Sequence, residues 1–195
     1  TDKSEETDFL RKKLEKGSSR GIEIKIRHTP QKLSIGAKRN FCNHLADGDI
    51  LINMDDDDYY FPERISHSVN KLRESEFCGS HQLPIYFLDD ESMWISDPGK
   101  GISCAGSFAY RKSILEKTWY SENAVNGEEI SFTDFYKLPT TELDPFKTMI
   151  CISHAGNTFD KRRLRAMFEN ESFKLRSGTN VLGKETFFKT VKSSH

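Results

Sequence analysis

The sequence lacks any apolar run near the roughly 18 residues that a membrane-spanning helix requires, so we expect no membrane span. It also lacks a C-x-x-C pair, because its four cysteines, Cys42, Cys78, Cys104 and Cys151, are widely spaced. This spacing disfavours a zinc site or a thioredoxin-type redox centre. We expect four reduced and mostly buried thiols in a reducing compartment.

An excess of charge of one sign is absent as well. The 29 Lys and Arg residues face 30 Asp and Glu residues, which gives a formal net charge of −1. Bulk charge therefore does not favour an anionic partner, and we expect no nucleic acid partner. The sequence has no internal repeat and no low-complexity linker. Because 195 residues can bury a core, we expect a single domain over residues 1–195.

Short apolar stretches alternate with helical patterns along the chain, which favours a mixed or parallel sheet with helices on both faces. Residues 22–26 alternate isoleucine with charge, which predicts a strand with one buried face. Residues 36–46 have helical spacing, with Ala37, Phe41 and Leu45 as the expected buried stripe. We further predict strands at 50–54, 83–88, 107–110 and 148–153, helices at 3–16, 111–117 and 128–136, a loop at 89–101, and a helix after Pro62 packed through Ile65, Val69 and Leu72.

Four consecutive aspartates, Asp55–Asp58, directly follow the apolar run at 50–54. A short apolar run bounded by turn signals is typical of a buried strand, and ligands of open α/β sheets bind beyond the carboxyl ends of the strands. Neighbouring carboxylates repel one another unless a cation is present, and oxygen ligands suit magnesium, manganese or calcium. The run predicts a metal site at a sheet edge, with a solvated acidic loop or a helix N-terminus as the alternative.

Four other segments could carry chemistry, and each also has an ordinary structural explanation. Lys38 and Arg39, at a predicted helix start, suit phosphate binding, although cations there are commonly only solvated. The paired glutamates at 128–129 could supply a general base or complement a helix N-terminus. His154, at the end of a predicted strand, could bind a metal, although a lone His usually does not. The small residues of segment 104–112 allow either a ligand or a neighbouring strand to approach the backbone.

Three short motifs follow one another in a fixed order: G-A-K-R-N at 36–40, A-D-G-D at 46–49 and D-D-D-D at 55–58, with Pro62 after them. This order resembles the G-x-x-R-N, A-x-G-D and D-x-D-D motifs of family-two glycosyltransferases. The resemblance implies an α/β GT-A fold (Rossmann-like, as in nucleotide-diphospho-sugar transferases), with a mixed sheet flanked by helices. More loosely, the chain is similar to the compact glycosyltransferase domains of large algal DNA viruses, the chlorovirus type.

The resemblance implies a metal-dependent inverting transfer of a sugar, of the hexosyltransferase type, from a nucleotide-diphosphate donor to a glycan hydroxyl. UDP is the expected nucleotide, and Mn²⁺ or Mg²⁺ would bridge its diphosphate. Asp57 is the implied direct metal ligand, with Asp58 as a substitute and His154 completing the site. Asp55 would share in holding the metal and diphosphate. The implied donor-binding residues are Lys38, Arg39, Asp55 and Asp56, and the implied substrate-binding residues are Trp94, Gly106, Ser107 and Glu128.

For the acceptor, Glu129 aligns with the catalytic acid of the family. It would deprotonate the acceptor hydroxyl, and Asp134 is the fallback. Trp94 could stack on a sugar face or simply cover the core. The basic stretch at 161–165 could form a flap over the diphosphate or a solvated helix, and we expect the basic tail at 160–195 to dock on the core.

Two departures from the family pattern matter. The family normally begins with a strand, a helix and a second strand that ends in Asp-Asp-Gly, whereas this chain begins as if just after them. We therefore expect the first strand-helix-strand to be missing. Glu129 also stands where the family more often has Asp. The expected location is the cytoplasm, or the host cytoplasm if the chain is viral.

Two other functions stay open at this point. A sugar-nucleotidyltransferase also uses an α/β sheet and paired acids, but it would carry a Gly-rich phosphate loop near its N-terminus, and none is visible. A non-catalytic module that binds metal or carbohydrate would bind a cation without a nucleotide. A pure calcium site needs neither the Lys38-Arg39 pair nor the distant glutamates.

Overall fold

The computed structural model describes residues 21–157 and 160–163. The chain divides into two compact units, Thr1–Leu33 and Ser34–His195. The helix predicted at 3–16 and the tail beyond residue 163 lie outside the described residues. No helix in the described part of the chain is long and apolar enough to cross a bilayer.

The predicted strand at 22–26 is wrong. Residues 21–33 of the first unit contain no helix or strand, and Ile22, Ile24 and Ile26 are all exposed. Alternating isoleucines form a strand only where a neighbouring strand satisfies the backbone groups. Among the described residues, no strand pairs with this segment.

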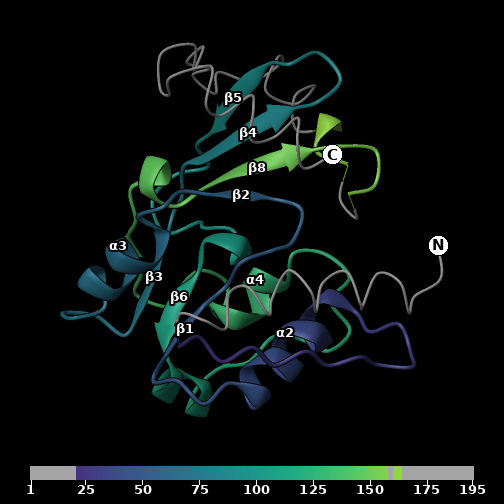
Figure 1. Ribbon diagram of the computed structural model, residues 1–195. Helices are drawn as coiled ribbons and strands as arrows, with labels where there is room; N and C mark the ends of the chain where they lie inside the picture. The colour runs from purple at the N-terminus through teal and green to yellow at the C-terminus, as the bar shows by residue number, and fades with distance from the viewer. Residues whose placement is uncertain (1–20, 158–159, 164–195) are drawn as a thin grey trace. The chain divides into compact units, whose positions relative to one another are not determined.

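The second unit contains two mixed sheets (Figure 1). In the first sheet, β6 (Ala109–Arg111) runs antiparallel to β1 (Ile50–Ile52) and to β3 (Phe77–Gly79), whereas β3 runs parallel to β7 (Thr141–Glu142). The other three strands therefore share one direction, and their carboxyl ends lie at one edge, where α/β proteins bind ligands. The order of the first sheet is β1 (Ile50–Ile52), β6 (Ala109–Arg111), β3 (Phe77–Gly79) and β7 (Thr141–Glu142).

The second sheet has two parallel central strands and an antiparallel strand at each edge. Its order is β2 (Tyr59–Tyr60), β8 (Met149–Ser153), β4 (Leu83–Phe87) and β5 (Met93–Ser96). The strands predicted at 83–88 and 148–153 are confirmed, and β8 ends next to His154 as expected. The predicted loop at 89–101 is wrong in part, because it contains β5, which forms a hairpin with β4.

Helix α2 (Ile35–Leu45) confirms the helix predicted at 36–46, but not its buried face. Ser34 caps it by accepting the backbone N–H of Ala37 at 3.1 Å. Gly36 and Asn43 are its buried residues, whereas Phe41 is exposed. A Cβ at Gly36 would lie 1.9 Å from the Ser121 carbonyl oxygen, so only glycine allows this close approach.

Helix α3 (Arg64–Lys71) follows Pro62 as predicted. Its apolar stripe is incorrect in part, because Ile65 is 59% exposed and the buried helical residues are Arg64 and Ser68. The Arg64 guanidinium donates to the carbonyl oxygens of Asn53 and Phe108. A buried cation therefore ties the end of β1 to the start of β6.

The remaining helices are short. The helix predicted at 128–136 ends early as α4 (Glu128–Phe132), because Asp134, Phe135 and Tyr136 adopt left-handed backbone conformations. The helix predicted at 111–117 and the strand predicted at 107–110 are partly replaced by 3₁₀ turns. These turns are η1 (Ala105–Ser107) and η2 (Lys112–Glu116), and a third such turn, η3 (Pro145–Lys147), lies before β8.

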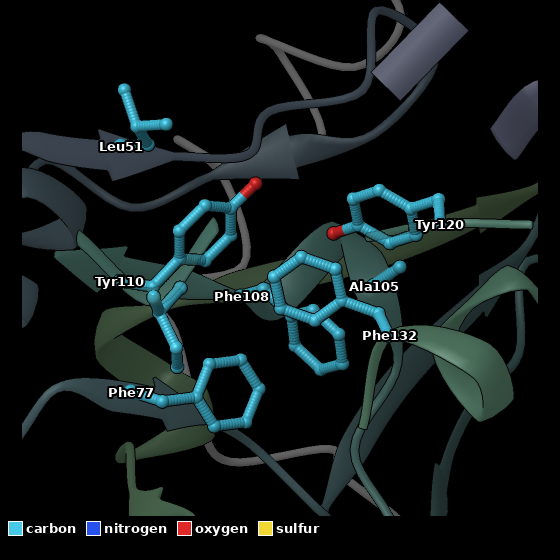
Figure 2. Close-up of a cluster of buried hydrophobic side chains, with 8 residues drawn as sticks. Leu51, Phe77, Ala105, Phe108, Tyr110, Tyr120 and Phe132 are labelled. Atoms are coloured by element: carbon cyan, nitrogen blue, oxygen red, sulfur yellow. The ribbon is translucent and has the colours of Figure 1, made fainter. Parts of the chain in front are cut away.

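An aromatic core holds α4 against the first sheet (Figure 2). The Phe132 ring stacks on Tyr120 at a centroid distance of 4.4 Å and also contacts Phe108 and Tyr110. Phe77 meets Phe108 edge-on at 4.7 Å. Aromatic pairs of this kind contribute about 0.5–1.5 kcal/mol beyond burial. Since Phe132 ends α4, this packing fixes the position of the glutamates at the start of that helix.

Candidate active site

The acid run forms a loop between β1 and β2. Its first turn is fixed by the Asp55 backbone N–H, which donates to the Tyr60 hydroxyl oxygen at 2.7 Å. Just before it, the Asn53 amide donates to the Ala105 carbonyl at 2.8 Å. Burial raises the pKa of Tyr60, so this hydroxyl stays neutral. These two hydrogen bonds hold the loop in place, one of them against η1, and neither of them uses a carboxylate of the run.

Asp55 is paired with α2 rather than open to solvent. Arg39 contacts both of its carboxylate oxygens, at 2.9 and 3.0 Å, in a bidentate arrangement. The Nε of the same guanidinium donates to Glu128 at 2.8 Å. Burial by itself would lower the pKa of Arg39, but Asp55, and less strongly Glu128, outweigh it and raise the pKa. Arg39 therefore joins the acid loop to α4, which lies close to α2 (Figure 1).

Gly106 lies directly against the Asp55 carboxylate. A Cβ at this position would be 2.9 Å from Asp55 Oδ2 and 3.3 Å from the Met149 methyl group. The Asp55 side chain cannot easily move away, because Arg39 holds both of its oxygens. Glycine is thus required for packing at this point, as one of the two explanations of segment 104–112 suggests.

Glu128 and Glu129 begin α4 but have different surroundings. The Glu128 side chain is 6% exposed and forms an ion pair with Arg39. Glu129 is partly buried, and burial, followed by the charge of Glu128, raises its pKa, while Arg39 and a hydrogen bond from Tyr136 act in the opposite direction. Its position at the start of α4 beside Arg39 and its raised pKa make Glu129 a candidate general base.

Asp57 turns toward the segment after β8. Its Oδ2 lies 3.4 Å from His154 Nε2 and accepts the Asn157 amide at 2.9 Å. Both side chains are partly exposed, at 39% for Asp57 and 26% for His154. The pairing of Asp57 with His154 connects residues that are nearly 100 positions apart in the sequence.

Asp57 and His154 have a spacing that suits two ligands of one divalent cation. Two ligands at 2.1 Å from an ion and at a right angle lie about 3 Å apart, close to the 3.4 Å between Asp57 Oδ2 and His154 Nε2. Residues 21–157 and 160–163 gather no group of three His, Cys, Asp or Glu side chains suited to a metal. Magnesium commonly takes one or two protein ligands, with substrate phosphates and water completing its shell, so two protein ligands fit.

Binding of a cation by His154 would require one hydrogen bond of this residue to change. The Gly156 N–H donates to His154 Nδ1 at 3.1 Å, which places the proton of a neutral imidazole on Nε2, facing Asp57. Coordination through Nε2 moves that proton to Nδ1. The Gly156 hydrogen bond would then have to open.

Asp58 is directed into the second sheet. Its carboxylate is 5% exposed and accepts the Ile152 N–H at 2.9 Å, and Lys161 Nζ lies 3.7 Å away. Burial raises the pKa of Asp58, although Lys161 opposes that effect. Asp58 therefore fastens the loop to β8, and Lys161, in the basic stretch, is one of its partners.

The other predicted residues are less centrally placed. Lys38 and Asp56 are exposed. Trp94 lies on β5, where its ring meets Phe87 edge-on at 6.5 Å and its indole N–H donates to Ser92, which favours the core-covering explanation. Asp134 is exposed and pairs with Lys137 at the surface.

Ser107 is used within the fold. Its hydroxyl donates to the Cys104 carbonyl at 2.7 Å and accepts the Ser80 N–H at 3.0 Å. All four cysteines are free thiols, and burial raises the pKa of Cys78 to about 12 and that of Cys104 to about 11. The predicted burial of the thiols is confirmed for Cys78 and Cys151, whereas Cys104 is partly buried and Cys42 is exposed.

Sequence reasoning missed Tyr60 and Asn157, two residues of the site. Asn157 falls in the segment directly after His154, so its position was a usable signal. Tyr60 contributes its hydroxyl from a short strand, and no local pattern marks such a function.

Comparison with known proteins gives one match. The model of glycosyl transferase family 2 matches residues 2–96, which is just under half of the 195-residue chain. The match includes α2 and the acid loop but not α4 or His154. No curated protein and no solved structure matches, so nothing here bears on the algal-virus resemblance. Residues 2–96 are therefore similar to glycosyl transferase family 2, the mixed α/β architecture is the GT-A fold, and together they support a glycosyltransferase.

Proposed function

We propose that the protein is a metal-dependent, inverting glycosyltransferase that moves a sugar from a UDP-sugar to a glycan hydroxyl. The observation that carries the proposal is the Arg39 bridge, which brings the acid loop and the glutamates of α4 together. In a transferase, donor and acceptor groups have to meet in this way. The family match of residues 2–96 supports the same reaction class.

On the donor side, Asp57 and His154 would hold Mn²⁺ or Mg²⁺. The cation, when bound, would neutralise charge on the leaving diphosphate. Lys38, which is exposed and precedes Arg39 on α2, is available for the donor phosphates. We assign Asp58 a structural function, because its carboxylate already accepts the Ile152 N–H of β8 and lies near Lys161.

On the acceptor side, Glu129 would accept the proton of the attacking hydroxyl. The acceptor oxygen forms a bond to the anomeric carbon while the bond from that carbon to the diphosphate oxygen breaks. The electron pair leaves with the nucleotide diphosphate, and the proton ends on the Glu129 carboxylate. Attack opposite the leaving group inverts the anomeric configuration.

The test is a thermal-shift titration with UDP, with and without Mn²⁺. A ligand that binds only the native state raises its stability. A rise that needs both UDP and Mn²⁺ supports the proposal and justifies a screen of UDP-sugars. A rise with Mn²⁺ alone would contradict it and favour a metal-binding module. Hexose specificity, a cytoplasmic location and a viral origin are separate predictions that this titration does not address.

A further inference from the structure

Asn157 contacts both of the residues that would hold the metal. It lies in the turn after β8, where its side-chain oxygen accepts the His154 backbone N–H at 2.7 Å and its own backbone N–H donates to the His154 carbonyl at 3.2 Å. The other end of the same side-chain amide donates to Asp57 Oδ2 at 2.9 Å. One side chain therefore joins the acid loop to the segment after β8.

The chemistry of these partners fixes which way the Asn157 amide points. A backbone N–H can only donate a hydrogen bond, and an ionised carboxylate can only accept one. The amide oxygen must therefore face His154 and the NH₂ group must face Asp57, because the reverse orientation would bring two donors together at one end and two acceptors at the other. Both ends of the amide are used, and an apolar side chain at this position could form neither hydrogen bond.

Closing the turn does not by itself explain this arrangement. Asn side chains commonly close turns by hydrogen bonds to nearby backbone groups, and the contact with His154, three positions away, is of that kind. The contact with Asp57 spans 100 positions and is not part of the turn. It requires that residue 157 also donate a hydrogen bond to the acid loop.

Asp58 and Lys161 join the same two segments through the backbone. The Asp58 carboxylate accepts the Ile152 N–H at 2.9 Å, and Lys161 Nζ donates to the Ile152 carbonyl at 2.9 Å. Ile152 precedes His154 by two positions, so the end of β8 is fixed to the acid loop. These contacts hold the backbone of the strand end, whereas the Asn157 amide reaches a candidate ligand itself.

The positions of Asp57 and His154 need such support because both side chains are partly exposed, at 39% and 26%. Partly exposed side chains can adopt several rotamers, and binding that first has to order them is weaker. A carboxylate has about four lone-pair positions, so Asp57 can keep the Asn157 hydrogen bond while it binds a cation. Carboxylates that bind metals are commonly hydrogen-bonded in this way.

We propose that Asn157 is a positioning residue, which holds Asp57 and His154 side by side so that both can bind one divalent cation. The inference rests on the proposed function, and it deepens that function by naming the residue that prepares the metal site. Asn157 acts on His154 through the backbone, so its contact does not depend on which imidazole nitrogen carries the proton.

The test is Asn157→Ala, which removes both side-chain hydrogen bonds without changing the charge. With saturating UDP, the affinity for Mn²⁺, followed by the electron paramagnetic resonance signal of free Mn²⁺, should fall about 10- to 100-fold, the usual result of losing a hydrogen bond to a metal ligand. In transfer assays the KM for Mn²⁺ should rise by the same factor, whereas kcat at saturating Mn²⁺ should change little. Asn70→Ala, the same change at an exposed position on α3, should leave both quantities in place.

Asn157→Ser separates the turn from the contact with the ligand. The Ser hydroxyl can still accept the His154 N–H, but the side chain is one bond shorter than that of Asn and should lose the contact with Asp57. We expect this variant to melt closer to the wild type than Asn157→Ala and to show the same loss of Mn²⁺ affinity.

The inference and the proposed function fail in different ways. Wild-type Mn²⁺ affinity in either Asn157 variant would overturn the inference, because closing the turn would then be the function of Asn157. If the wild-type protein itself binds no Mn²⁺ in the presence of UDP, the proposed function is contradicted, and the inference fails with it.

Discussion

Asp55 and Asp58, at the two ends of one run of four aspartates, are held by different parts of the fold. Asp55 is bound by Arg39 of α2 and lies against Gly106 beside the first sheet. Asp58 is buried on β8 of the second sheet. Between them, Asp57 is partly exposed and faces His154. The same residue type thus has three different surroundings within four positions.

This difference shows that partners, and not residue type, decide what each carboxylate can do. A carboxylate used by a buried guanidinium or by a backbone N–H contributes to structure, and its loss leaves a buried partner unsatisfied. A partly exposed carboxylate beside a His can bind a cation at little structural cost. The run fastens both sheets to one loop through Asp55 and Asp58, and Asp57 is the partly exposed carboxylate that we propose as the ligand.

The largest expected effect lies outside the run, on α4. Glu129→Gln should lower the transfer rate about 10²- to 10⁴-fold, because a positioned general base contributes that much, while the affinity for the donor stays the same. Rates with saturating donor, together with titration of donor binding, check both parts. Asp134→Asn is the control, since Asn tolerates a left-handed backbone and Asp134 is exposed. Loss of transfer in that variant, with normal transfer by Glu129→Gln, would move the base to Asp134.

Arg39→Ala should be the most destabilising change at the Asp55 end. It leaves Asp55 and the buried Glu128 without their shared cation, which typically costs about 3–5 kcal/mol. Denaturant unfolding would measure the loss. Lys38→Ala, at the neighbouring exposed position, should change stability by less than about 0.5 kcal/mol. Similar stabilities for the two variants would show that the bridge does not hold the loop.

Asp58→Ala tests the opposite end of the run. It leaves the Ile152 N–H without an acceptor and removes a partner of Lys161, so we expect a loss of about 1–3 kcal/mol. The melting temperature should fall by several degrees, at about 2–4 °C per kcal/mol for a chain of this size. Asp58→Asn keeps an oxygen acceptor and should lose less. If both variants melt like the wild type, the attachment to β8 is not significant for stability.

Gly106→Ala should have an effect similar in size to that of Asp58→Ala. Its new Cβ would lie 2.9 Å from Asp55 Oδ2, and moderate overpacking costs about 1–3 kcal/mol. Gly48→Ala is matched to it, because a Cβ there would lie 3.5 Å from the Ile50 carbonyl oxygen, an ordinary contact. Unfolding of the two variants side by side should show a loss only for Gly106. Equal losses would mean that the contact with Asp55 is not the cause.

Much of the second unit could be predicted from the sequence, since its strands and helices are encoded in local patterns. β1, β4, β8 and α2 all appear near their expected positions. β5 was missed because a four-residue strand lies inside an acidic, Gly- and Pro-containing stretch. The segment 22–26 shows the opposite error. Its alternating isoleucines predict a strand, but no strand pairs with it among the described residues.

The candidate site was harder to predict, because its contacts join distant residues. Arg39 meets Glu128 across 89 positions, and no local pattern specifies that pair. Nor could four identical aspartates reveal which one is buried. The residue types and the order of the motifs indicated the kind of chemistry. The tertiary contacts show which side chains are already paired and which are accessible to a ligand.

The most direct test compares Asp57→Ala with Asp58→Ala in one titration of UDP with Mn²⁺, in which melting temperature and binding are both recorded. We predict that Asp57→Ala melts close to the wild type but loses the stabilisation that depends on both UDP and Mn²⁺. Asp58→Ala should melt lower and keep that stabilisation. Wild-type binding of UDP and Mn²⁺ by Asp57→Ala would contradict the assignment of Asp57 as the ligand of the run.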